Sequence, residues 1–280
     1  MTNKCRICGS VKTTHNVVNK YNQLNCDFCG STSFYFKQKY EYGDDEKYSD
    51  STYLDNYELR WAHQIISDYL LGTDNNLQCL EVGCFNGQFV NELRSHGIIS
   101  FGTDINTKAI EYGRNKYFPK SREILSADMS TIVQDVNTII LIDVLEHMED
   151  PLGFIQSLPN CITKLIISSP VANKVLYDKS DFPPHHYSRI NPFGLTEVLR
   201  NYGFSSKEHL WIQSSVLLLF RNLIGRLKYG WNKKWYEGSP VFTIQSRRVR
   251  KIYKLVENIT SPIFKLLGLR YSAFVLIINR

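Results

Sequence analysis

The stretch Leu77–Val90 constrains the fold more than any other part of this 280-residue chain. A short apolar segment ends at Glu81, the glycines Gly83 and Gly87 follow, and a helix-like pattern of apolar residues comes next. This order predicts a strand, a tight turn and a helix. Glycine suits such a turn because it lets backbone N–H groups approach a ligand at the positive end of the helix. The stretch therefore predicts the opening of a nucleotide-binding βαβ unit.

An acidic residue stands where the second strand of such a unit would end. Residues 98–103 form a second apolar segment, and Asp104 follows it, twenty-one residues after Gly83. An acid in this position can accept hydrogen bonds from the ribose hydroxyls of a nucleoside. The alternative is that Asp104 caps a helix that begins near Thr107. The spacing favours the nucleoside-binding interpretation.

Further apolar segments predict a doubly wound α/β sheet. Thr138–Ile142 is a nearly uninterrupted apolar run, as expected of a central parallel strand that is buried on both faces. Ligands of such sheets lie across the C-terminal edges of the strands, so Asp104, Asp128 and Asp143 can converge on one site. Asp128 as a simple turn residue is the alternative. The other predicted elements are strands over residues 123–127, 164–170, 207–211 and 273–278 and helices over residues 57–71, 107–116 and 192–202.

As a set, these motifs resemble those of class I S-adenosylmethionine-dependent methyltransferases over roughly residues 50–211. Glu81–Gly87 is similar to the first motif of that family, and Leu141–His147 is similar to the motif after its fourth strand. The resemblance implies a Rossmann-like, seven-stranded sheet and S-adenosylmethionine as cofactor. Many members have a glycine where this chain has Phe85. The implied cofactor-binding residues are Glu81, Gly83, Cys84, Phe85, Gly87, Asp104, Ile105, Asp128, Met129 and Asp143.

Four of the seven cysteines form two Cys-x-x-Cys pairs, Cys5 with Cys8 and Cys26 with Cys29. Two such pairs can complete a closed, tetrahedral zinc site, and a segment of this size would gain its folding energy from the ion. A redox dithiol is the alternative, but it needs only one pair. We therefore predict a structural zinc ribbon over residues 1–35.

An aromatic-rich connector or lid is predicted over residues 36–60, and the methyltransferase domain over residues 61–280. The aromatic side chains either pack the ribbon onto the domain or cover the cofactor. Arg60, the last residue of this connector, is expected where it can meet the cofactor carboxylate. The last two strands of the sheet are expected to be separated by a basic, helical insertion at about residues 213–271.

The candidate catalytic residues are His186, His185, His147 and Glu146. Glu146 and His147 follow the fourth predicted strand, and the other two lie in the loop 181–189, which is expected over the same edge of the sheet. An imidazole there can accept a proton from a substrate hydroxyl. The alternatives are a purely structural loop, a structural His147, and a metal ion shared by these histidines and Glu146.

Charge is distributed unevenly along the chain. Residues 212–280 hold 13 Lys and Arg against 2 Asp and Glu, whereas residues 1–211 hold 20 against 25. The basic part predicts contact with a membrane surface, an anionic glycan or, less favoured, nucleic acid, with a solvated cap over the substrate pocket as the alternative. The sequence shows no leader peptide and no apolar run long enough to span a bilayer, so a cytoplasmic location is expected.

Together these features favour an S-adenosylmethionine-dependent methyltransferase that acts on a sugar, glycan or other small acceptor, at oxygen. An RNA methyltransferase that uses the ribbon and the basic region is a second hypothesis, although the ribbon is weakly charged and no base-reading motif is evident. A non-catalytic, cofactor-binding module is the third.

Overall fold

A computed structural model describes residues 4–18, 21–35, 50–73, 76–172, 182–183, 185–214 and 271–280. The predicted helices of the insertion and residues 36–49 of the predicted connector lie outside the described residues.

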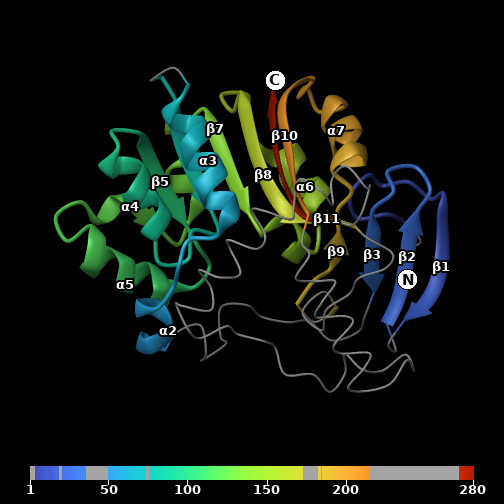
Figure 1. The fold of residues 1–280 in the computed structure, drawn as a ribbon, viewed down its shortest axis with the longest axis horizontal. Helices are drawn as coiled ribbons and strands as arrows, with labels where there is room; N and C mark the ends of the chain where they lie inside the picture. The colour runs from blue at the N-terminus through green and yellow to red at the C-terminus, as the bar shows by residue number, and fades with distance from the viewer. Residues whose placement is uncertain are drawn as a thin grey trace.

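A seven-stranded sheet in the order β10-β11-β8-β7-β4-β5-β6 forms the centre of the fold (Figure 1). The five strands from β8 to β6 are parallel, whereas β11 runs antiparallel to both of its neighbours. This confirms the predicted doubly wound, seven-stranded sheet, whose last two strands form an antiparallel pair. The strands are β4 Gln78–Val82, β5 Ile99–Thr103, β6 Leu125–Ser126, β7 Thr138–Ile142, β8 Lys164–Pro170, β10 Ser206–Ser214 and β11 Tyr271–Asn279.

Helices cover both faces of the sheet. Apolar side chains of α3 and α4 pack with one set of strand residues, and those of α6 and α7 pack with the other set. Thr138–Ile142 is buried at every position, as expected for a strand between two layers. The helices are α2 Ser51–Asp55, α3 Trp61–Leu71, α4 Gln88–Ser95, α5 Thr107–Tyr117, α6 Pro151–Ser157 and α7 Pro192–Arg200.

Three predicted elements are shorter than expected, and one of them, the helix predicted over residues 192–202, ends at Arg200. The helix predicted from residue 57 begins at Trp61, because Arg60 has an extended backbone and acts as the N-cap. The strand predicted over residues 123–127 spans only Leu125–Ser126, because Arg122–Ile124 forms a 3₁₀ turn. A short strand at the edge of a sheet limits pairing with other chains.

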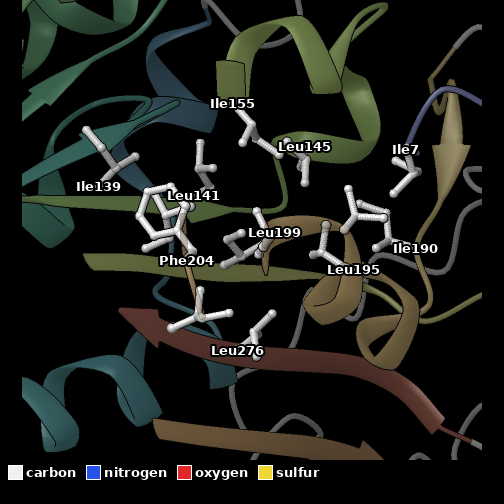
Figure 2. Packing of buried hydrophobic residues seen from close by; sticks show 14 of the residues in the cluster. Ile7, Ile139, Leu141, Leu145, Ile155, Ile190, Leu195, Leu199, Phe204 and Leu276 are labelled. Carbon is white, nitrogen blue, oxygen red and sulfur yellow. The ribbon is translucent and has the colours of Figure 1, made fainter. Parts of the chain in front are cut away.

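The N-terminal segment forms a second, smaller sheet in the order β1-β2-β3-β9. Its first three strands are Thr13–Val18, Tyr21–Cys26 and Thr32–Tyr35, whereas β9, Ser188–Arg189, comes from the loop before α7. Ile7 of the N-terminal segment packs in the same core cluster as Ile190 and Leu195 (Figure 2). The ribbon therefore shares both a sheet and a core with the larger domain.

No helix within the described parts of the chain combines the length and the apolar character that crossing a membrane requires.

Candidate active site

The turn between β4 and α4 has the backbone that the glycine pattern predicts. Gly83 and Gly87 have φ values of 80° and 71°, in the left-handed region. A Cβ atom on Gly83 would lie 2.4 Å from the side chain of Val144, and one on Gly87 would lie 2.6 Å from Leu125. Both glycines are therefore required by conformation and by close packing.

Phe85 adopts the same left-handed conformation, with a φ of 53°. Its N–H donates to Oδ2 of Asp104 at 2.8 Å. The centroid of its ring lies 5.0 Å from the ring centroid of Tyr57 and 5.7 Å from that of Tyr53. The chain thus keeps a glycine-like backbone at this position and uses the side chain to hold the segment that precedes α3. These tyrosines belong to the predicted connector, so its described part packs over the glycine turn.

The strained backbone of Phe85 leads to a prediction about stability. Phe85→Ala and Phe85→Gly both lose the ring contacts, but only glycine relieves the left-handed conformation, which costs other residues roughly 1–2 kcal/mol. Glycine loses part of this advantage through the greater freedom of its unfolded chain. We expect Phe85→Gly to be more stable than Phe85→Ala by about 1 kcal/mol in urea unfolding. Equal stabilities would show that the turn relaxes in the variants.

Two carboxyl groups lie beside this turn. Asp104 directly follows β5 and accepts hydrogen bonds from the N–H groups of Phe85 and Asn106, both at 2.8 Å. Burial raises its pKa, although these two bonds act in the opposite direction. Glu81 is 3% exposed, and its Oε2 has no hydrogen-bond partner within the described structure. Burial, assisted by the charge of Asp104, raises the pKa of Glu81 to about 8.

An ion pair lies at the end of the neighbouring strand. Arg60 donates from Nη1 to Oδ2 of Asp143 at 2.6 Å. Asp143 directly follows β7 and has a positive φ of 54°. The backbone N–H of Arg60 donates to Nδ1 of the buried His63 at 3.0 Å, which closes the first turn of α3. His63 was not found from the sequence, because histidine is not a typical residue for this capping role.

The other predicted cofactor residues differ in how far they are exposed to solvent. Ile105 is 67% exposed, next to Asp104. Cys84 is buried with Leu125, and its backbone N–H donates to the carbonyl of Thr103 at 3.0 Å. Asp128 is exposed after β6, where it caps a 3₁₀ turn by accepting from the N–H of Ser130 at 2.9 Å. Met129 is partly buried and packs against the main core.

A second group of polar side chains follows Asp143 along the chain. Glu146 and His147 lie in the 3₁₀ turn η5, Leu145–His147, and His186 lies in the loop before β9. The rings of His147 and His186 have centroids 4.6 Å apart, and Nδ1 of His147 donates to the carbonyl oxygen of His185 at 2.6 Å. The sequence predicted these four residues at one edge of the sheet, and the structure brings three of their side chains together.

Burial changes the protonation of this cluster. It lowers the pKa of His147 and lowers that of His186 well below the usual range, with the neighbouring histidine adding to the effect at His186. Burial also raises the pKa of Glu146 well above its usual range, and the charge of Asp143 acts in the same direction. Both imidazoles are therefore held in the neutral form, which can accept a proton or bind a metal ion.

The ribbon contacts the loop that carries His186. Tyr187 donates its N–H to the carbonyl of Glu146 at 2.9 Å and accepts from the N–H of Phe34 in β3 at 2.8 Å. The next two residues pair with β3, where Ser188 stands opposite Ser33. Arg6 also bonds to the backbone carbonyl of Glu149. The ribbon therefore holds the segment that directly follows His186, a contact that the sequence pattern did not predict.

The four cysteines of the two pairs come together at the base of the ribbon. Their sulfur atoms all lie within 4.8 Å of one another, with Cys5 and Cys29 at 3.7 Å and Cys8 and Cys26 at 3.5 Å. Four sulfur atoms at about 2.3 Å from a tetrahedral zinc ion would be about 3.8 Å apart. All four are free thiols, so the arrangement fits a metal site better than a pair of disulfides.

Comparison with solved structures gives the same fold. A SAM dependent methyltransferase from Archaeoglobus fulgidus superposes with a TM-score of 0.50 at 17% identity, covering 82% of this chain and 100% of that chain. Phosphoethanolamine N-methyltransferase 2 of Haemonchus contortus, in complex with S-adenosyl-L-methionine, superposes with a TM-score of 0.51 at 11% identity. That match covers 89% of this chain and 62% of the other. No curated protein sequence matches the chain.

The sheet order, the glycine turn and the match to a methyltransferase family model together define a class I S-adenosylmethionine-dependent methyltransferase. The chain belongs to the methyltransferase domain family, whose model matches residues 53–209, more than half of its length.

Proposed function

We propose that this enzyme transfers a methyl group from S-adenosylmethionine to an oxygen of a sugar, a glycan or another small molecule. One observation carries the proposal: the segment that follows β7 joins the cofactor edge of the sheet, at Asp143, to the histidine cluster, at His147. The methyl donor would then bind beside Asp143, and the acceptor oxygen, which needs to lose a proton, would bind beside His147, a few residues further along the chain.

The residues beside the glycine turn fit the cofactor. Gly83 and Gly87 give the turn its left-handed backbone, and Oε2 of Glu81, which has no hydrogen-bond partner among the described residues, offers a partner to a cationic group. We expect Asp104, which follows β5, to accept from the ribose hydroxyls, and Arg60, which pairs with Asp143 at the neighbouring strand end, to turn to the cofactor carboxylate. When bound, S-adenosylmethionine supplies a methyl group on a sulfonium centre for in-line displacement.

The histidine cluster fits the acceptor side. An oxygen nucleophile near neutral pH needs help in losing its proton as its bond to the methyl carbon forms. The bond to the carbonyl of His185 fixes the tautomer of the His147 ring, so that Nε2 carries the lone pair that a base needs. The basic region after residue 211 would hold an acceptor that is anionic or bound to a membrane surface.

Transfer of a radiolabelled methyl group to fractions of a cell extract tests this function. We expect the label in a sugar, glycan or small-molecule fraction. Label in RNA would instead support the second hypothesis. Cofactor binding without transfer to any fraction would support a non-catalytic module.

Asp104→Ala tests the cofactor site. The variant loses charge-assisted hydrogen bonds to the ribose, which typically contribute about 1.5–3 kcal/mol, so the affinity for S-adenosylmethionine should fall roughly 10- to 150-fold. Isothermal titration calorimetry measures the change. Asp128→Ala is the matched comparison at the end of the next strand. Unchanged affinity in a folded Asp104→Ala protein would remove this residue from the ribose site.

Glu81 predicts a proton release that accompanies cofactor binding. Because its pKa is about 8 in the free enzyme, the carboxyl group is mostly protonated at pH 7. A bound cation stabilises the ionised form and lowers this pKa, so the complex holds fewer protons. Calorimetry in buffers of different ionisation enthalpy should show the release of up to about one more proton for the wild type than for Glu81→Gln. The same proton count in both proteins would contradict this role.

A further inference from the structure

We propose that Glu146, His147 and His186 form a binding site for a divalent transition-metal ion on the acceptor side of the active site. This inference rests on the proposed function and deepens it. One ligand atom from each of the three residues lies within 4.8 Å of the other two. The three come from two segments, the η5 turn and the loop before β9, which the bond between Tyr187 and Glu146 holds together.

Glu146 provides the strongest argument for an ion. The residue is 1% exposed, and neither of its carboxylate oxygens has a hydrogen-bond partner within the described structure. Burial of a carboxylate is unfavourable unless a cation or strong hydrogen bonds replace the water that it loses. A bound cation would both neutralise the charge and occupy the two oxygens.

The two histidines have the properties of metal ligands. Nδ1 of His147 donates to the backbone carbonyl of His185, which leaves the lone pair on Nε2. Metal-binding histidines usually make this kind of bond, since it fixes the tautomer and the orientation of the ring. The ring of His186 packs at 70° to that of His147, so the two imidazoles approach the same space from different directions.

The ligand set indicates which ions would bind. Two imidazoles and one carboxylate suit zinc and neighbouring transition metals, whereas magnesium and calcium prefer oxygen ligands. A tetrahedral ion with ligands at about 2.1 Å needs ligand atoms about 3.4 Å apart, so a small adjustment of these side chains would close the site. Three protein ligands leave one position open, as in catalytic zinc sites. An acceptor hydroxyl bound there would lose its proton more readily, so the ion would promote the step that the proposed function assigns to a histidine, whose lone pair it uses.

Cobalt binding to the full-length protein, with zinc already in the cysteine site, tests the proposal without cofactor or acceptor. We expect one zinc and one cobalt ion per chain after equilibrium dialysis. The cobalt spectrum should lack a thiolate charge-transfer band, because no sulfur contributes to the site. Glu146→Gln and His186→Ala should bind cobalt at least about 100-fold more weakly, since even an outer partner of a metal ligand typically contributes 10- to 100-fold.

His185→Ala is the matched control, because it removes an adjacent imidazole but keeps the carbonyl that holds His147. It should bind cobalt as the wild type does. Retention of the ribbon zinc shows that each variant is folded. The proposal would be overturned if wild-type protein with zinc in its cysteine site bound no cobalt. It would also be overturned if either variant bound cobalt with unchanged affinity. Because methyl transfer is not measured, this failure would leave the proposed function standing.

Discussion

Replacing His147 or His186 by alanine is expected to lower the single-turnover rate of methyl transfer by about 10²- to 10⁴-fold, the usual contribution of proton transfer by a positioned group. The reason is that the acceptor oxygen would face the cluster that contains both rings, whose centroids are 4.6 Å apart. The affinity for S-adenosylmethionine should stay nearly unchanged, because the glycine turn, Glu81 and Asp104 lie on other segments.

Rapid-quench measurement determines these rates, with the labelled cofactor and the acceptor that the labelling experiment identifies. His96→Ala is the matched control, since this exposed histidine lies at the end of α4, outside the cluster. His185→Ala should have a smaller effect than His147→Ala or His186→Ala, because the bond that His185 makes to His147 uses its backbone carbonyl. Wild-type rates in both His147→Ala and His186→Ala would show that the cluster is structural.

Loss of the metal ion from the cysteine site is expected to unfold the ribbon and to slow methyl transfer, whereas the affinity for the cofactor should stay unchanged. We propose one structural zinc ion per chain at Cys5, Cys8, Cys26 and Cys29; such ions stabilise small peptides by about 10–16 kcal/mol. The rate should fall because β3 pairs with β9, directly after the loop that carries His186. Cofactor binding should persist because β4 and β5 belong to the other sheet.

Cys26→Ser tests this expectation, and Cys161→Ser is the matched control because Cys161 is an exposed cysteine outside the cluster. Three measurements are needed: zinc content, protease sensitivity of the N-terminal segment, and the transfer rate. A Cys26→Ser protein without zinc but with a wild-type rate would show that the ribbon does not position the histidine loop.

The sequence alone was sufficient for the features that depend on local backbone chemistry. The turn at Gly83 and Gly87 was predictable because only glycine tolerates both the left-handed backbone and the contacts found there. Thr138–Ile142 was predictable because a strand buried on both faces needs a continuous apolar run. The four cysteines were predictable as a cluster because two Cys-x-x-Cys turns suit one ion.

Only the tertiary structure decided how distant segments meet. The pairing of β3 with β9 joins residues more than 150 positions apart through backbone hydrogen bonds, which carry no side-chain signature. The approach of His186 to Glu146 depends on that pairing and on the Tyr187 backbone. The left-handed backbone of Phe85 is likewise set by its neighbours, because the intrinsic preference of phenylalanine opposes it. Local propensity therefore specified the cofactor turn, whereas long-range packing specified the acceptor side.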